Sequence, residues 1–360
     1  GGMDAVKRDS NHYVVDIFRG KGGTDHVYSF HGPPGEIAQS DLKLDVQTSG
    51  TYAGEHIAKG TWAKDFPVGY SHLYNVRRDP MPPPSFILDW KAEAGYRGLK
   101  PNDDVHLRLH SLSQVSDVAL ADGDPPQNKP GNPRRLGYAL LHNAGDNLNS
   151  IFVSVIEPYR KQPFIKSAER MDDGKSGTVA IKIERMDGGI DYVLYSAIPE
   201  KAMRLPNGIS MTGTAGYVRE MKGKVNKGIL VNGSALKYNS LTVKSSVPIR
   251  GKIVRMNREL KGGGWLIVDK KLPTDGSLTG QQIVIETTGE RDASYTIRDI
   301  QREGNETKIF CGPITFVQGY KGGEMVVRTA SVPKDYTQGY LYDFEEGAAF
   351  QIAVHKEWTP

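Results

Sequence analysis

The sequence has few of the features that would place a chain in a specialised class. Its 360 residues include a single cysteine, Cys311, which excludes a disulfide framework and a cysteine-based metal site. No apolar run approaches the roughly 18 residues needed to cross a bilayer, so we expect no membrane partner. No helical pattern of useful length is present, because "SDVALADG" and "REMKGK" are short and interrupted. These absences exclude a mainly helical fold.

An excess of one charge is also missing. The 46 basic and 42 acidic residues are interspersed and give a formal net charge of +4. Nucleic-acid binders usually gather their basic residues into a patch or stripe, whereas "NVRRDP", "NPRRLG" and "PYRKQP" are short clusters. We therefore expect no nucleic-acid partner. A slight positive balance would still suit an acidic polymer as substrate.

Common catalytic motifs are absent as well. The sequence contains no "GxSxG" and no "HExxH", and "KGGT" and "KGGGW" lack the spacing of a phosphate-binding loop. In "HLRLH" (106–110) a strand would place both histidines on one face with Arg108 between them, as an exposed basic face. A metal site needs three or four ligands, and the spacing of Asp25, His26 and His31 does not demand one.

The patterns that are present belong to β-strands. "HYVVDIFRG", "DVHLRLHSL", "SIFVSVIEPY", "GTVAIKIER" and "IDYVLYSAI" alternate apolar and polar residues and are rich in Val, Ile, Tyr and Phe. "RMDDGKSG" and "RMDGGID" each lie between two such patterns, as hairpin turns do. The sequence predicts an all-β protein of stacked antiparallel sheets, a β-sandwich followed by a second, smaller β domain. Cys311 is expected to be a buried strand residue.

A change in loop character indicates two domains. Long, Pro-rich loops separate the strands before "EKAMRLPNGI" (200–209), and a tight meander with regular turns follows it. We expect a central β-sandwich domain over residues 1–205 and a C-terminal β domain over residues 206–360.

One short stretch, "TDHVYSFHG" (24–32), gathers two histidines, a tyrosine and a phenylalanine after a Gly-Gly pair. Glycine tolerates the positive φ of tight turns, so we expect a hairpin with Gly22-Gly23 at its turn and Arg19 facing His26. On the strand, His26 and Tyr28 share one face and His31 points to the other. A half-buried aromatic face and a functional site both fit this pattern.

The same stretch resembles a family. "YVVDIFRGKGGTDHVYSFHG" (13–32) is similar to a segment of heparinase II/III-like polysaccharide lyases. "HLRLHSL" (106–112), "SIFVSVIEPYRKQPFI" (150–165) and "DYVLYS" (191–196) resemble successive strands of the same family's central sheet domain, in the same order. The resemblance covers about residues 10–200.

The resemblance implies an N-terminal (α/α) toroid, a central stacked β-sheet domain and often a C-terminal β domain. It also implies β-elimination on uronic-acid polysaccharides, in which a Tyr/His pair moves the protons and a donor neutralises the carboxylate. The family's Tyr and Asn come from the toroid. Its sheet-borne histidines and zinc ligands lie in "HGH"-like and "AHN"-like motifs, which this sequence lacks.

Only four residues therefore carry over from the family: Arg19, His26, Tyr28 and His31 are expected to bind substrate by lining or supporting the groove that faces the toroid. We assign no catalytic residue, no metal ligand and no cofactor to this chain, and expect no lyase activity from it alone. The implied partners are an anionic polysaccharide, such as a glycosaminoglycan or alginate, and an N-terminal toroid domain or chain. The implied location is periplasmic or secreted in a bacterium.

Two other functions fit the same composition. In a non-catalytic carbohydrate-binding module, exposed aromatic residues would stack on sugar rings, and the candidates are Trp62, Trp90, Trp265 and Trp358. Trp265 is the best of these because its neighbouring glycines would leave its face open. In a structural or assembly module, the sheet edges would form an interface and no glycan would bind.

Overall fold

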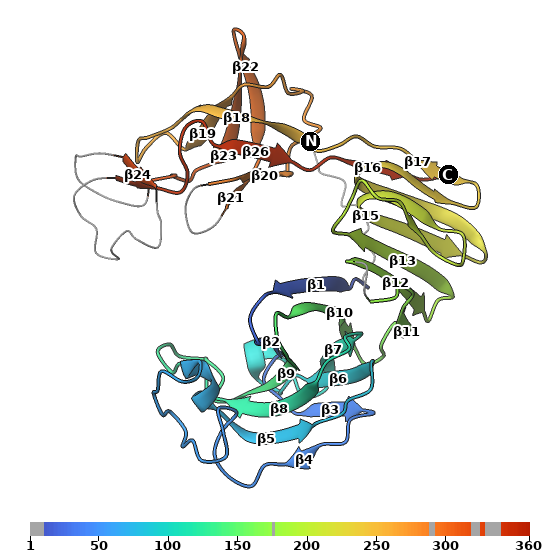
Figure 1. The fold of residues 1–360 in the computed structure, drawn as a ribbon, viewed down its shortest axis with the longest axis vertical. Helices are drawn as coiled ribbons and strands as arrows, with labels where there is room; N and C mark the ends of the chain where they lie inside the picture. The colour runs from blue at the N-terminus through green and yellow to red at the C-terminus, as the bar shows by residue number, and fades with distance from the viewer. Residues whose placement is uncertain (1–10, 175–176, 288–291, 318–324, 328–339) are drawn as a thin grey trace. The chain divides into compact units, whose positions relative to one another are not determined.

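The computed structural model describes residues 11–174, 177–287, 292–317, 325–327 and 340–360, and β-strands dominate it (Figure 1). Its sheets are stacked and antiparallel, so the predicted fold class is confirmed. Two short 3-10 helices occur, η1 (Val68–His72) and η2 (Tyr96–Gly98). Among the described residues, no helix is long and apolar enough to span a membrane.

Two five-stranded sheets form the first part of the chain. The first sheet has the order β1 (Val14–Lys21), β10 (Asn149–Arg160), β7 (Val105–Ser111), β6 (Phe86–Lys91) and β3 (Ile37–Ser40). The second sheet has the order β2 (Asp25–His31), β9 (Leu136–Ala144), β8 (Asp117–Gly123), β5 (Leu73–Asp79) and β4 (Asp45–Val46).

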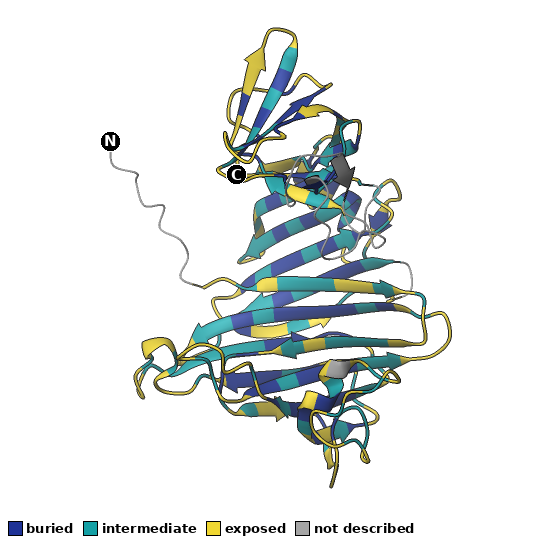
Figure 2. Cartoon of the chain, turned by 90° about the vertical axis from the view of Figure 1, so that its left-hand side faces the viewer, coloured by how far each residue is buried: buried dark blue, intermediate teal, exposed yellow. Residues whose placement is uncertain are grey.

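Side chains from both sheets meet in one core. Leu88, Trp90 and Leu109 from the first sheet pack with Leu120 and Leu141 from the second, and all five are fully buried. Burial along these strands does not strictly alternate: β7 and β9 each contain a run of three consecutive buried residues (Figure 2). Residues on both faces of these strands are therefore covered.

An eight-stranded sheet follows. Its strands are β11 (Ile165–Arg170), β12 (Thr178–Arg185), β13 (Gly189–Ser196), β15 (Ser210–Met221), β16 (Lys224–Tyr238) and β17 (Leu241–Val243), with β14 (Met203–Arg204) beside β15 and β27 (His355–Trp358) beside β16. β12 is hydrogen-bonded to both β11 and β13. The predicted turns "RMDDGKSG" and "RMDGGID" therefore join strands that are neighbours in the sheet.

The last sheet has seven strands, in the order β21 (Ala293–Thr296), β20 (Gln282–Ile285), β26 (Ala349–Ile352), β18 (Ile249–Met256), β19 (Gly264–Val268), β23 (Glu306–Gly312) and β22 (Asp299–Glu303). A separate parallel pair consists of β24 (Met325–Val327) and β25 (Tyr340–Tyr342). Cys311 lies in the core of the seven-stranded sheet, where burial raises the pKa of its thiol to about 12. The prediction of a buried strand cysteine is confirmed.

The chain divides into two compact units that interleave in sequence. One contains residues 1–193 and 219–224, and the other contains residues 194–218 and 225–360. The expected boundary between residues 205 and 206 lies inside the segment 194–218. A single cut in the sequence does not describe this division, because the chain changes unit at 193–194, 218–219 and 224–225.

The expected hairpin of β1 with β2 is wrong. β1 pairs with β10 along its whole length, and β2 pairs with β9, so the Gly22-Gly23 link carries the chain from one sheet to the other. Gly22 donates to the carbonyl of Leu148 at 2.7 Å, and Leu148 donates to the carbonyl of Gly23 at 3.0 Å, so this corner pairs with the β9–β10 corner. Tyr28 and Phe30 of β2 pack against the core between the sheets, whereas Phe18 of β1 stays largely exposed.

Candidate functional site

His26 lies at the corner where the two sheets meet. Its Nε2 is 2.6 Å from the carbonyl oxygen of Gly22, which can only accept, so Nε2 carries the proton. Its Nδ1 is 2.9 Å from Ser150 Oγ in the facing sheet. Both ring nitrogens are therefore hydrogen-bonded within the protein. His26 stabilises the corner, and neither nitrogen is left to contact a reactant.

Tyr28 lies deeper between the sheets. Its hydroxyl donates to Asp16 Oδ2 at 2.7 Å, and its ring stacks on Phe152 with 5.6 Å between centroids. Burial and the bond to the Asp16 carboxylate raise the pKa of Tyr28 above its usual value. The predicted substrate contact for Tyr28 has no support in this geometry, since its side chain packs in the core.

Of the other two predicted residues, Arg19 lies close to the Gly22-Gly23 corner and His31 lies at the far end of β2. Arg19 is exposed and pairs with Ile151, so the two side chains share the outer face of the first sheet. His31 pairs with Tyr138 and contacts its ring at 5.2 Å between centroids. Five residues of strand separate His31 from His26, or roughly 17 Å. Arg19 and His26 thus lie near the Gly22-Gly23 corner, and His31 does not.

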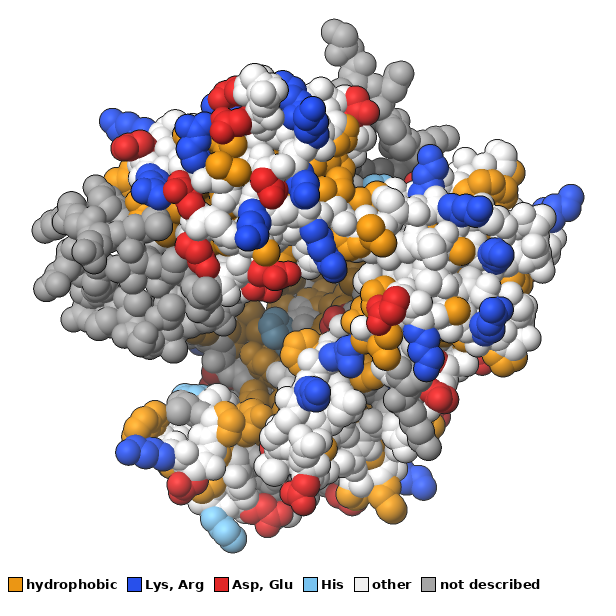
Figure 3. Space-filling model, turned by 45° about the horizontal axis from the view of Figure 1, so that its top comes forward, with side chains coloured by type: hydrophobic (Ala, Val, Ile, Leu, Met, Phe, Trp, Pro, Cys, Tyr) orange, Lys and Arg blue, Asp and Glu red, His pale blue; other side chains and the backbone are white. Residues whose placement is uncertain are grey.

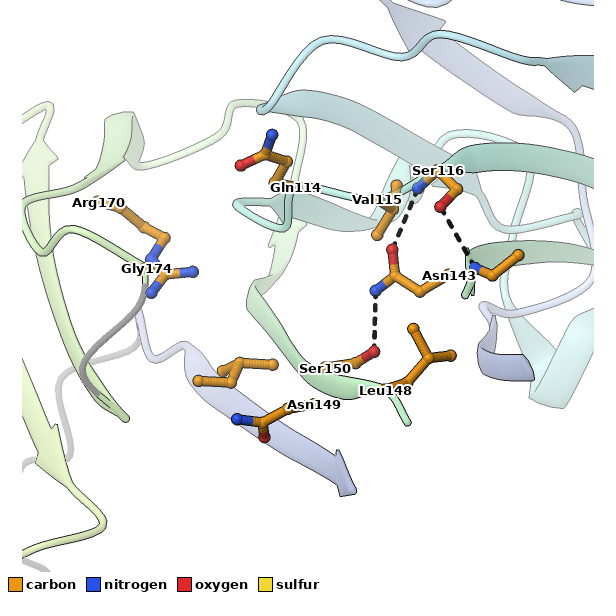
Figure 4. Close-up of a pocket in the computed structure, with 11 residues that line it drawn as sticks. Gln114, Val115, Ser116, Asn143, Leu148, Asn149, Ser150, Arg170 and Gly174 are labelled. Carbon is orange, nitrogen blue, oxygen red and sulfur yellow. Dashed lines mark hydrogen bonds between the residues drawn. The ribbon is translucent and has the colours of Figure 1, made fainter. Parts of the chain in front are cut away.

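A pocket of about 410 Å³ is lined by Ser150, the hydrogen-bond partner of His26 (Figure 4). We call it the Asn143 pocket. Its lining comes from the ends of β9 and β10, from the segment before β8 and from the β11–β12 hairpin: Gln114, Val115, Ser116, Asn143, Ala144, Leu148, Asn149, Ser150, Ile151, Arg170 and Gly174. A second hollow of about 320 Å³ shares Gln114, Arg170 and Gly174 with it. The two hollows are therefore neighbours within this unit.

Hydrogen bonds hold the polar wall of the pocket in place. Asn143 Nδ2 donates to Ser150 Oγ at 3.1 Å, and the amide of Ser116 donates to Asn143 Oδ1 at 3.1 Å (Figure 4). Because Ser150 also contacts His26, a chain of bonds runs from the corner into the pocket wall. The result is a fixed set of amide and hydroxyl groups, which suits recognition of sugar hydroxyls.

Cationic groups flank this polar wall. Arg170 lies on the opposite side in Figure 4 and is paired with Asp172. Arg19 and Lys21 pair with Ile151 and Asn149 of the lining and share their face of the sheet. Neither Arg19 nor Lys21 has an ion-pair partner in the described part of the chain. The pocket can therefore attract a carboxylate.

Sequence reasoning missed Asn143, Ser150 and Arg170. The only signal for the first two is "HNAGDNLNS" (142–150), where turn-forming residues lie between two strand patterns. Nothing in the sequence indicates that this turn meets the Gly22-Gly23 corner or that Arg170 lies beside both.

The "HLRLH" face is not the exposed basic surface that we expected. His106, Arg108 and His110 do share one face of β7, but acidic residues neutralise it. Asp89 Oδ1 lies 2.6 Å from His106 Nδ1, and Arg108 Nε donates to Asp89 Oδ2 at 2.7 Å. His110 is buried, 2.9 Å from Glu157 Oε2. On the view in Figure 3, too, acidic and basic side chains are interspersed.

We expect Asp89→Asn to reduce stability more at neutral pH than in acid. Burial by itself would raise the pKa of Asp89, but hydrogen bonds from Tyr159, His106 and Arg108 outweigh it and hold the pKa below its usual value. A carboxyl with a lowered folded-state pKa stabilises the fold above its unfolded pKa of about 3.9, and loses this effect as pH falls. The Tm deficit of the variant should be about 2 °C or more at pH 7 and smaller at pH 3, because the stabilisation is lost as pH falls through the folded-state pKa. An equal deficit at both pH values would contradict this.

The side of the sandwich next to the corner is open. β1 and β2 are edge strands of their sheets in the described structure. Phe18 contacts Phe152 beside it in the same sheet and Tyr28 in the other sheet, yet 54% of its surface is exposed. An edge of this kind, with backbone groups and an aromatic ring uncovered, is suited to pairing with another chain or segment.

The tryptophan candidates differ sharply in exposure. Trp90 is fully buried and Trp62 is 69% exposed, while Trp265 and Trp358 are half-buried. The ring of Trp265, the preferred candidate, has Lys308 Nζ 4.8 Å from its centroid. Trp62 is thus the most accessible of the four for stacking on a sugar.

No group of three or more His, Cys, Asp or Glu side chains in the described residues is arranged to hold a metal ion. No family model matches the sequence, and no curated protein matches it. The functional argument therefore depends on the site itself.

Proposed function

We propose that this chain is the β-sheet portion of a polysaccharide lyase that acts by β-elimination on a uronic-acid-containing polysaccharide. The Asn143 pocket would hold part of the anionic chain, and an N-terminal (α/α) toroid would supply the proton-transfer groups. The location that fits this function is periplasmic or secreted.

The observation that carries the proposal is the neighbourhood of His26. A polar pocket, two cations without ion-pair partners in the described structure, Arg19 and Lys21, and an open sheet edge lie at one corner of one unit. A uronate offers a carboxylate for the cations and hydroxyls for the amides. None of the described residues that line the pocket is a tyrosine or histidine, and in this proposal a group of the toroid would take the C5 proton.

The test is ultraviolet absorbance from unsaturated uronate ends, measured with heparan, chondroitin, alginate and ulvan. The chain alone should give a flat trace. Addition of an N-terminal toroid segment from a heparinase II/III-like lyase should give a rising trace on at least one of the four. A rising trace from the chain alone would contradict the division of labour proposed here.

The matched variant in this assay is Arg19→Ala with Lys21→Ala. Loss of two cations beside the pocket should lower the reconstituted rate at low substrate concentration by about tenfold at low salt, and less at high salt. Lys166→Ala removes an exposed charge from β11 at a position outside the pocket lining and serves as the control. Equal effects of the two changes would argue against the Asn143 pocket.

A second function is favoured by the exposure of Trp62. In a non-catalytic carbohydrate-binding module this ring would stack on a sugar, and the chain would bind glycans without any gain of activity from the toroid. A glycan array on wild type and Trp62→Ala separates the two functions, because the lyase proposal does not place Trp62 in the Asn143 pocket.

A further inference from the structure

A separate hollow of about 510 Å³ lies on the outer face of the second sheet. We call it the Tyr52 pocket. Its floor is formed by Asp25, Arg78 and His142 from β2, β5 and β9, and its wall by Tyr52, Phe66 and Tyr70 from the segment that precedes β5. That segment is anchored to the sheet, since the amide of Tyr52 donates to the carbonyl of Leu73 at 2.8 Å.

The floor is a chain of charged groups in fixed positions. His142 Nδ1 lies 2.6 Å from Asp117 Oδ2, and its Nε2 lies 3.2 Å from Asp25 Oδ2. Arg78 is paired with the other oxygen of Asp117. Asp117 thus holds both His142 and Arg78 in place. Both ring nitrogens of His142 are engaged, so the charged groups that remain for a ligand are the Arg78 guanidinium and the Asp25 carboxylate.

The wall is aromatic. The rings of Tyr52 and Tyr70 meet edge to face with 4.9 Å between centroids, and the Arg78 guanidinium lies 5.0 Å from the Tyr52 centroid. Burial raises the pKa of both tyrosines above the usual value, and Asp25 adds to this for Tyr70. Both phenols are therefore protonated at neutral pH and can donate hydrogen bonds.

The charge of this pocket differs from that of the Asn143 pocket. Asp25 and Asp65 line it, and the charge of Arg78 is neutralised by Asp117. Even a protonated His142 would leave the net charge negative. An anionic ligand is disfavoured, while a ring with several hydroxyls gains charge-assisted hydrogen bonds from the carboxylates and an apolar contact from the aromatic wall.

We propose that the Tyr52 pocket binds a hexose ring that carries no acidic group. The proposal rests on the proposed function only for the source of the ligand: a polysaccharide with both uronate and uncharged sugars would supply a ring to each pocket. Asp25 pairs with Ala144 and His26 pairs with Asn143, so the two pockets lie at the same end of β2 and β9.

The experiment is a ligand-observed NMR titration of the full chain with cellotriose, an uncharged probe, and with a trimer of mannuronic acid. Cellotriose should bind, and Tyr70→Ala should weaken its binding by about tenfold, because one aromatic face of the pocket is lost. Tyr70→Phe should keep most of the affinity. Tyr96→Ala, which removes a tyrosine of η2 outside the pocket, should change nothing.

Failure to bind cellotriose, or equal binding by wild type and Tyr70→Ala, would overturn the proposal. So would weaker binding of the mannuronate trimer in Tyr70→Ala, since the pocket would then hold the acidic sugar. The mannuronate trimer tests the proposed lyase function separately. Its binding should be lost in the Arg19→Ala, Lys21→Ala variant. Cellotriose binding without mannuronate binding supports the Tyr52 pocket and contradicts the function proposed for the Asn143 pocket.

Discussion

Replacement of Glu157 by alanine is expected to lower the free energy of unfolding by about 3–5 kcal/mol. The Glu157 side chain is fully buried. Its Oε1 accepts hydrogen bonds from the amides of Phe164 and Ile165 at 2.6 and 2.7 Å, and its Oε2 lies 2.9 Å from His110 Nε2. The substitution leaves two backbone donors and a buried imidazole without their acceptor, and such groups cost more than the net value of the bonds.

Guanidinium unfolding followed by circular dichroism measures this loss. Glu169→Ala is the matched control, because Glu169 is an exposed residue of the neighbouring strand β11, and it should change the unfolding free energy by less than about 0.5 kcal/mol. Glu157→Gln keeps an acceptor for the two amides. Its loss of unfolding free energy should lie between those of Glu157→Ala and Glu169→Ala. A loss below about 1 kcal/mol in Glu157→Ala would show that the buried carboxylate does not hold β10 to the start of β11.

Replacement of Trp90 by alanine should also lower the free energy of unfolding by about 3–5 kcal/mol, for a different reason. The ring is fully buried, its N–H donates to the carbonyl of Gly137 at 2.9 Å, and it meets Phe30 edge to face at 5.4 Å between centroids. Its fit depends on a glycine, since a Cβ at Gly32 would lie 2.4 Å from Trp90 Cγ. Alanine would leave a cavity that this rigid sandwich cannot close.

The control for Trp90 is Trp62→Ala, which removes the same side chain from an exposed position and should stay within about 0.5 kcal/mol of wild type. Chemical denaturation of the two variants measures both unfolding free energies. If both lost similar stability, the assignment of Trp90 to the core would be wrong. The pair also bears on function, because only an exposed tryptophan can stack on a sugar.

The residues in and around the two pockets differ in how far the sequence predicts them. The sequence predicts Arg19 and His26 as site residues, and neither is among the residues that line the Asn143 pocket. Their partners Ile151 and Ser150 do line it, and Ser150 is 124 residues away from His26 in sequence. The sequence carries no signal for Asp117, His142 and Arg78, because each is an ordinary polar residue at a strand position until strand pairing brings them together.

The sequence by itself determined that this chain is all β, that His26 and Tyr28 share one face of their strand with His31 on the other, and that Cys311 is buried. These features depend on the two-residue period of a strand and on local turn chemistry, which neighbouring residues encode. Tertiary structure alone decided that β1 pairs with β10 and β2 with β9, and which side chains line the two pockets. Strand pairing uses backbone hydrogen bonds common to all residues, so the partner of a strand is selected by packing against distant segments and not by its own residues.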